Sequence, residues 1–338
     1  MRTLIVLVFM LLSGAATAQS DGQLVDRFDR ADAERDYRSA LVAARAILER
    51  YPDSATWNFN AARAHAMLGD LDEAIACLDR CAELGYTGIA SFEQHRDLNP
   101  LREREDFEAI LGRVRANAKK RLDGFKSLAA EHTPAAFVPE RLRDRLEPGE
   151  KPAILIALHG TGGKGQEMID ALRPVCDNLN VVCVAPDALR PSGGGFGWTY
   201  RDESAWLIDK VVREAIDDYG ADPERVMLLG FSQGANIALA MASGGAEPFT
   251  ALIPVCGHYE PEASAMTGTP PAVYLISGSR DPWHTTYDQA EVDFMDAGAA
   301  VMKQVVPSMG HAMPGPRELE RALSWALEQS KQKANRHP

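Results

Sequence analysis

The chain has 338 residues, of which 46% are hydrophobic and 25% are charged, a balance typical of globular proteins and sufficient for about two domains. Its formal net charge is −12 and no Lys/Arg-rich block is present, which argues against a nucleic-acid partner. Beyond the N-terminal segment no stretch is apolar enough to cross a bilayer.

Residues 1–18 have the pattern of an export signal. Arg2 precedes the apolar run LIVLVFMLL, and Ala16-Thr17-Ala18 forms a small-x-small cleavage site. The run is too short for a stable membrane span, and no Cys follows it as lipoprotein processing requires. An uncleaved N-terminal anchor is the alternative. We expect a secreted or periplasmic protein.

Residues 19–115 form the first predicted domain. They show helical spacing and an internal repeat of 34 residues that aligns Tyr37 with Leu71 and Ala40 with Ala74. The second unit, WNFNAARAHAMLGDLDEAIACLDRCAELG, resembles a tetratricopeptide repeat, in which small residues let paired helices approach closely. This region is a candidate to bind a peptide, dock a protein partner or gate a cleft. A generic helical hairpin is the alternative.

Residues 116–150 are predicted to be a helix and a linker, because their charged sequence is broken by Pro134, Pro139 and Pro148. From 151 to 330, short apolar runs alternate with longer amphipathic segments, which predicts an α/β domain with a mostly parallel sheet covered by helices. The expected strands are AILIALH, VVCVAP, VMLLGF, ALIPVC, AVYLIS and AVMKQVV, and the expected helices lie near 164–178, 203–219, 233–243, 287–297 and 315–330. Residues 331–338 form a polar tail.

A Gly-x-Ser-x-Gly sequence, Gly230-Phe231-Ser232-Gln233-Gly234, lies between the apolar run VMLL and the Ala-rich segment ANIALAMA. This pattern between a strand and a helix is that of a nucleophile elbow. The tight turn leaves room only for very small residues on either side, and it projects the serine hydroxyl at the positive end of the following helix. Ser232 is therefore the predicted nucleophile.

A serine hydroxyl needs a neighbouring base, and the base needs an orienting acid. In this fold the partners follow in the order Ser, acid, His. Asp281 comes just after the run AVYLIS, and His311 follows the last predicted strand. His284 also fits the order, but it lies on the same loop as Asp281 and has little room to place its ring between Asp281 and Ser232. We expect His311 to be the base.

Three other titratable residues follow the preceding strand. Glu260 and Glu262 occupy a position that some lipases use for the acid, so they remain alternatives to Asp281. His258 lies there too and is interpreted as a pocket or surface residue.

The loop HGTGG, which begins at His159, directly follows the strand AILIAL. Its glycines allow backbone N–H groups to turn inward toward the oxyanion of an acyl-transfer reaction. The Thr161 N–H, or else the Gly160 N–H, is the expected donor, together with the N–H of Gln233. A phosphate loop is disfavoured because Lys164 is followed by Gly165 rather than by Ser or Thr.

Five residues are predicted to bind substrate: His159, Gly160, Trp198, Trp283 and His284. The stretch PSGGGFGW is predicted to be a flexible loop. Trp198 at its end, with Tyr200, is a candidate aromatic wall of the site for the acyl or alcohol group of the substrate. A packed loop anchor is the alternative role for Trp198.

No metal set and no cofactor are predicted, since the histidines are scattered without paired spacing. The cysteines are Cys77, Cys81, Cys176, Cys183 and Cys256. Most are expected to be small buried residues, Cys256 among them. A Cys176–Cys183 disulfide is an option in an oxidising compartment.

Residues 150–330 resemble the α/β-hydrolase superfamily and, within it, the phospholipase/carboxylesterase group that includes acyl-protein thioesterases. The blocks HGTGG, DPERVMLLGFSQGA, GSRDP and GHAMP carry this resemblance. It implies Ser232 as nucleophile, Asp281 and His311 as its relay, and backbone donors at Thr161 and Gln233. The sequence departs from this group at two places. Ala235 stands where many relatives have a second Gly, and no Val-Pro follows the acid. The second departure affects the substrate pocket.

The expected function is that of an exported serine hydrolase that cleaves carboxylic esters through an acyl-enzyme. The expected substrate is a small or lipid-like ester. A peptidase of prolyl-oligopeptidase type uses the same triad order and is one alternative. A helical-repeat adaptor with a non-catalytic hydrolase scaffold is the other.

Overall fold

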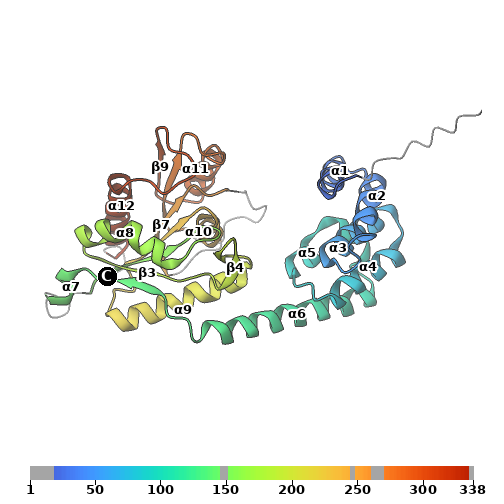
Figure 1. Cartoon of the computed structure of the whole chain (residues 1–338), viewed down its shortest axis with the longest axis horizontal. Helices are drawn as coiled ribbons and strands as arrows, with labels where there is room; N and C mark the ends of the chain where they lie inside the picture. The colour runs from blue at the N-terminus through green and yellow to red at the C-terminus, as the bar shows by residue number, and fades with distance from the viewer. Residues whose placement is uncertain (1–18, 145–150, 244–247, 260–269, 335–338) are drawn as a thin grey trace, which may run out of the picture. The chain divides into compact units, whose positions relative to one another are not determined.

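The computed structural model describes residues 19–144, 151–243, 248–259 and 270–334 (Figure 1). The predicted export signal, the alternative acids Glu260 and Glu262, and the last four residues of the tail lie outside these ranges. The chain divides into two compact units between Asp123 and Gly124. Within the described ranges, no helix has both the length and the apolar character that a membrane span needs.

The first unit is helical. Its elements are α1 (Asp21–Ala33), α2 (Tyr37–Leu48), α3 (Ala55–Leu68), α4 (Leu71–Glu83), α5 (Ile89–Gln94), a 3₁₀ turn η1 (Arg96–Leu101) and most of α6 (Glu105–Ala129). Ser54 caps α3 through the amide of Trp57, and Gly69 ends it in a left-handed conformation (φ 86°). Ala40, Ala62 and Ala74 are fully buried, so the helices pack closely, as the repeat pattern predicted.

Helix α6 runs through the boundary that the sequence predicted between residues 115 and 116. Its last residues belong to the second unit, where Phe125 and Ala129 are buried in the core. The linker prediction for residues 116–150 is also too broad, because Ala135–Phe137 form strand β1 of the main sheet.

The second unit contains a seven-stranded sheet of order β1-β3-β2-β6-β7-β8-β9. Strand β1 (Ala135–Phe137) pairs antiparallel with β3, and all other pairings are parallel. The parallel strands are β2 (Ala153–Leu158), β3 (Val181–Ala185), β6 (Val226–Phe231), β7 (Phe249–Val255), β8 (Ala272–Gly278) and β9 (Val301–Val306). They are the six apolar runs that the sequence predicted as strands.

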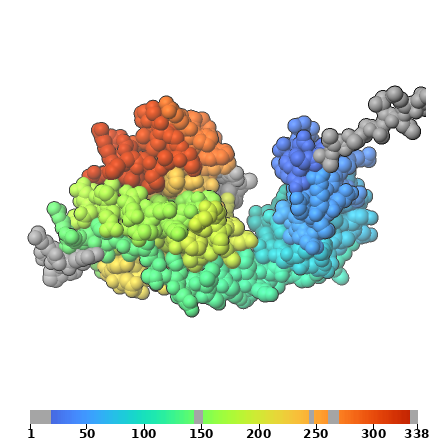
Figure 2. Space-filling model, in the orientation of Figure 1, coloured from blue at the N-terminus to red at the C-terminus, as the bar shows by residue number. Residues whose placement is uncertain are grey.

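Helices cover both faces of this sheet (Figure 1). They are α8 (Gly165–Leu179), α9 (Arg201–Tyr219), α10 (Gln233–Ser243), α11 (Thr286–Asp296) and α12 (Pro316–Ala334), with a short α7 (Glu140–Asp144). Alternate residues of β2 separate into two cores: Ile154 and Ile156 pack with α9, α10 and α11, while Leu155 and Ala157 pack with α8 and α12. Although they are far apart in sequence, α8 and α12 lie side by side, and their surfaces adjoin in Figure 2. The predicted fold class is confirmed.

The glycine-rich stretch before Trp198 is not the flexible loop that the sequence predicted. It forms an antiparallel hairpin of β4 (Arg190–Ser192) and β5 (Gly195–Gly197). Gly193 and Gly194 make its turn with φ of 54° and 91°, a region that glycine adopts without strain. The glycines therefore build a specific turn rather than a disordered segment.

Candidate active site

Ser232 lies in a sharp turn between β6 and α10. Its φ is 54°, which is unusual for a residue other than glycine, and its amide donates to Val255 O at 2.9 Å. A Cβ on Gly234 would come within 2.6 Å of Leu158 O, and one on Gly230 would overlap the backbone of Gly234. Both glycines are thus required by close backbone approach, which is the geometry of a nucleophile elbow.

His311 bridges Ser232 and Asp281. Its Nε2 lies 2.8 Å from Ser232 Oγ, and its Nδ1 lies 2.7 Å from Asp281 Oδ2. An ionised carboxylate only accepts hydrogen bonds, so beside it Nδ1 carries the ring proton and Nε2 is left to accept the serine O–H. Asp281 is 1% exposed and follows β8, while His311 follows β9. The carboxyl ends of three parallel strands therefore bring the three predicted residues together.

Asp281 is held on its other side as well, because its Oδ1 accepts from the amide of Trp283 at 2.8 Å. His284 does not contact this carboxylate. Its Nδ1 lies 2.7 Å from the backbone oxygen of Asp281, on the same loop. The structure thus places His311, and not His284, between acid and serine.

The HGTGG loop lies against the nucleophile. A Cβ on Gly160 would stand 3.1 Å from the Cβ of Ser232. The Gly162 amide donates to Phe196 O at 2.8 Å, and the Gly163 amide donates to Gly160 O. Within the described ranges, the amides of Thr161 and Gln233 donate to no other group of the protein. These are the two N–H groups that the sequence predicted as oxyanion donors.

Two residues predicted to bind substrate are buried instead. His159 is 1% exposed and Trp198 is 4% exposed. Trp198 Nε1 donates to His159 O at 2.9 Å, and His159 Nε2 accepts from the Ala188 amide at 3.1 Å. Burial lowers the pKa of His159, so its ring stays neutral and accepts that bond. The two buried rings pack beside the HGTGG loop and hold it in place. Trp198 therefore does not form the aromatic wall that was predicted for it.

The side chain of Gln233 completes this support. Its Oε1 accepts from the Trp198 amide at 2.9 Å, and its Nε2 lies 3.4 Å from Trp198 O. The residue that supplies one oxyanion donor from its backbone therefore anchors the β4–β5 hairpin through its side chain. Only the role of the Gln233 backbone amide was predicted from the sequence.

Trp283, one of the residues predicted to bind substrate, is 44% exposed. Its ring packs on His258 with 4.5 Å between ring centroids. His258 also lies at the rim of a small cavity of about 110 Å³, together with Asn236, Leu239 and Tyr259. Asn236 donates its amide to Ser232 O, so the cavity lies one helical turn beyond the nucleophile. Asn236 was not predicted from the sequence; its position four residues after the serine was the available signal.

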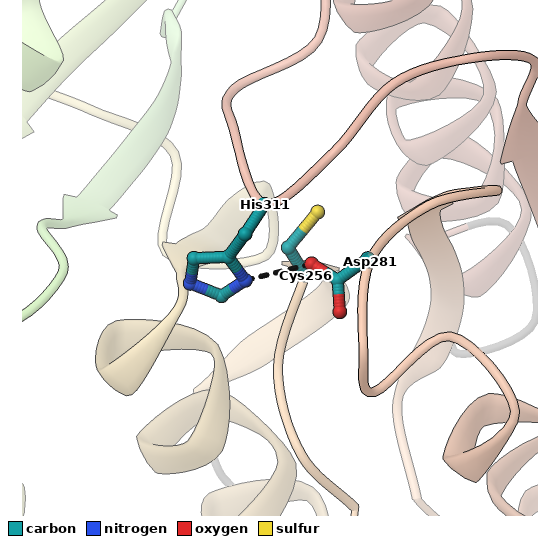
Figure 3. A group of neighbouring side chains, drawn as sticks. All are labelled: Cys256, Asp281 and His311. Atoms are coloured by element: carbon teal, nitrogen blue, oxygen red, sulfur yellow. Dashed lines mark hydrogen bonds and ion pairs between the residues drawn. The ribbon is translucent and has the colours of Figure 1, made fainter.

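Cys256 follows β7 directly behind the Asp281–His311 pair (Figure 3). Its Sγ lies 3.5 Å from Ala312 O and 3.9 Å from Gly310 O, the two carbonyls that flank His311. Burial raises the pKa of this thiol to about 11. A sulfur, a carboxylate oxygen and a ring nitrogen of Cys256, Asp281 and His311 lie within 4.8 Å of one another. The scattered positions of these residues in the sequence concealed this cluster.

All five cysteines are free. Cys176 and Cys183 are nevertheless neighbours, and the contact with Cys176, together with burial, raises the pKa of Cys183. The approach that the sequence predicted is present, but the disulfide is not.

Comparison with known proteins gives separate results for the two units. Residues 33–84 match the tetratricopeptide repeat family model. Feruloyl esterase B of Talaromyces funiculosus is 29% identical to this chain over 155 residues. The aligned segment is 43% of this chain and only 39% of the length of that esterase. MhqD of Bacillus subtilis (strain 168), assigned to the hydrolases by name, is 26% identical over 54% of this chain and 96% of its own length.

Solved structures of esterases are also similar in outline. Esterase PE8 is 22% identical, with a TM-score of 0.49 over 58% of this chain and 99% of its own. The Bacillus cereus carboxylesterase is 19% identical, with a TM-score of 0.48 over 62% of this chain and 99% of its own.

Proposed function

We propose that this chain, in which an α/β-hydrolase fold follows a tetratricopeptide-type helical unit, is an exported serine hydrolase of carboxylic esters. The observation that carries the proposal is the continuous hydrogen-bonded series from Ser232 through His311 to Asp281. The esterase and hydrolase names of the relatives support the same reaction class.

In the proposed reaction, Ser232 Oγ attacks the carbonyl carbon of the ester while His311 Nε2 takes the hydroxyl proton. Asp281 stabilises the imidazolium that forms, because its Oδ2 already accepts from Nδ1. The amides of Thr161 and Gln233 bind the oxyanion. His311 then gives its proton to the leaving alcohol, which departs as the acyl-enzyme forms.

Deacylation runs through the same groups in reverse. His311 removes a proton from water, and the resulting hydroxide attacks the acyl carbon. Collapse of the second tetrahedral intermediate releases the acid and returns the proton to Ser232 Oγ. Water is consumed in this step, and the general base, the orienting acid and the oxyanion donors all come from the chain.

Esters are favoured over thioesters of cytosolic carriers because the N-terminal sequence has the pattern of an export signal. The exposed Trp283 offers a flat apolar surface beside the acid loop for one side of such a substrate.

The test is hydrolysis of p-nitrophenyl esters from acetyl to palmitoyl by the mature protein and by Ser232→Ala. Activity that Ser232→Ala abolishes supports the proposal, and the preferred chain length measures the pocket. If no ester is hydrolysed and a fluorophosphonate does not label Ser232, the esterase proposal is contradicted and an adaptor role is favoured.

We propose that the helical unit docks a protein or peptide, as its family match suggests. Deletion of residues 19–115 tests this against gating of the site. The deletion removes the apolar residues of α6 that pack in the helical unit and keeps Phe125, which packs in the other. Unchanged kinetics on small esters would rule out gating and leave docking, whereas an altered KM would indicate gating.

A further inference from the structure

The thiol of Cys256 is not used in the reaction above, yet it lies beside both partners of the serine (Figure 3). It is 1% exposed, its Sγ lies 3.5 and 3.9 Å from two carbonyl oxygens, and it also contacts the side chain of Asp281. A thiolate sulfur, an imidazole nitrogen and a carboxylate oxygen are all ligands that proteins use for Zn²⁺. We propose that Cys256, Asp281 and His311 form an inhibitory site for a thiophilic divalent metal ion such as Zn²⁺.

The geometry is close to what such an ion needs. Zn–S bonds of about 2.3 Å and Zn–N and Zn–O bonds of about 2.0–2.2 Å place tetrahedral ligand atoms roughly 3.3–3.6 Å apart. The three donor atoms already lie within 4.8 Å, and the hydrogen bond between His311 Nδ1 and Asp281 Oδ2 is 2.7 Å long. Changes of up to roughly 1.5 Å in the distances between donor atoms therefore bring the three ligands to tetrahedral positions. A water molecule supplies the fourth.

The ion can reach these donors from the His311 side. The His311 side chain is 37% exposed, whereas the carboxylate of Asp281 is fully covered. The three ligands also come from the ends of the neighbouring strands β7, β8 and β9, so the sheet holds their backbones in place.

Metal binding and catalysis exclude each other at His311. Coordination replaces the proton on Nδ1, so the neutral ring carries its proton on Nε2, and the thiol proton of Cys256 leaves to solvent. One proton is released for each ion bound. With Nε2 protonated, His311 cannot accept the proton of Ser232, and Asp281 no longer orients the ring. The site therefore inhibits, and it does not supply a catalytic metal.

Binding is measured directly on the full-length chain, after treatment with EDTA and desalting, by titration with Co²⁺. We expect one equivalent to produce a near-ultraviolet thiolate-to-cobalt band, which Zn²⁺ then displaces. Cys256→Ser and Cys256→Ala should abolish the band. Ser232→Ala should keep it, and so should Cys176→Ser, which breaks the other thiol pair.

Inhibition is measured separately on the wild-type chain and the cysteine variants, as the activity of each with Zn²⁺ relative to its own activity without it. The Zn²⁺ concentration for half-inhibition should rise at least about tenfold in Cys256→Ala, since loss of even an outer-shell partner has about that effect. A cobalt band that persists in both Cys256 variants, with circular dichroism showing them folded, would overturn the site. Only the inhibitory consequence depends on the proposed function: a Cys256-dependent band in a chain without esterase activity would reject the esterase and retain the metal site.

Discussion

The carboxylate of Asp281 uses its two oxygens for two different tasks: Oδ2 lies 2.7 Å from His311 Nδ1, and Oδ1 accepts from a backbone amide of its own loop. The second bond fixes the carboxylate so that the first can orient the ring. Asp281→Asn removes the charge and allows the amide to donate to Nδ1, which selects the wrong tautomer of His311. We expect kcat on a p-nitrophenyl ester to fall by about 10⁴. Asp296→Asn, on the surface of α11, is the matched control and should leave kcat unchanged.

The two histidines that fit the triad order are distinguished by substitution. His311→Gln should reduce kcat by about 10⁴, because it removes the ring nitrogen that lies 2.8 Å from Ser232 Oγ. His284→Gln should change kcat less than about tenfold, because its ring nitrogen lies beside the backbone oxygen of Asp281 and not in the series that joins Asp281, His311 and Ser232. Steady-state kinetics of the two variants decide the assignment; equal losses would contradict it.

Gln233 joins the elbow to the hairpin through the buried amide of Trp198. Gln233→Ala leaves that N–H without an acceptor, so the free energy of unfolding should fall by about 1–3 kcal/mol. Gln233→Glu keeps an acceptor for the Trp198 N–H, but its second oxygen replaces the donor to Trp198 O, so it should restore only part of the lost stability. Urea unfolding of both variants provides the measurement. If both lose the same stability, the bond to the Trp198 amide is not what stabilises the hairpin.

The stability of the second unit should depend on pH through His159. Burial lowers the pKa of this ring in the folded state, whereas the unfolded chain protonates it near pH 6.5. As the pH falls below about 6.5, the unfolded state binds a proton that the folded state does not, so stability decreases, by up to about 1.4 kcal/mol per pH unit. The nearby carboxylates of Asp187 and Glu167 partly offset this loss.

The measurement for His159 is the slope of unfolding free energy between pH 7.5 and 5.5, compared with His159→Gln. The substitution should flatten the slope even if it lowers stability at every pH. Burial also lowers the pKa values of His132 and His95. Their contribution to the pH dependence of stability is the same in the wild-type chain and in His159→Gln. Identical slopes would show that His159 does not carry the effect.

Two glycines provide a test of the elbow. Gly234→Ala places a methyl group 2.6 Å from Leu158 O, a backbone atom of the central strand β2 that cannot move aside easily. We expect a loss of about 1–3 kcal/mol in unfolding free energy and a large fall in kcat. Gly124→Ala, within α6, meets nothing within 4 Å and should raise stability by up to about 1 kcal/mol. Thermal unfolding of both variants should give opposite signs.

The amino-acid sequence by itself determined the features that depend on neighbouring residues. Five of the six parallel strands follow from nearly continuous apolar runs, because a strand buried on both faces has few polar positions. The sixth, β9, is only partly buried and carries Lys303 and Gln304. The turn at Ser232 follows from two glycines that close backbone contacts require. The order of the chain then pointed to Asp281 and His311, since the carboxyl ends of parallel strands meet at one edge.

The tertiary structure decided what depends on contacts between distant segments. The three-residue strands β1, β4 and β5 are too short for periodicity to reveal, and each exists through its partner strand. His159 and Trp198 resemble pocket residues in sequence, but the hairpin and Gln233 enclose them. Cys256 adjoins Asp281 and His311 only because β7, β8 and β9 are neighbours in the sheet. Burial and the proximity of titratable groups are properties of the packed chain, and no local pattern encodes them.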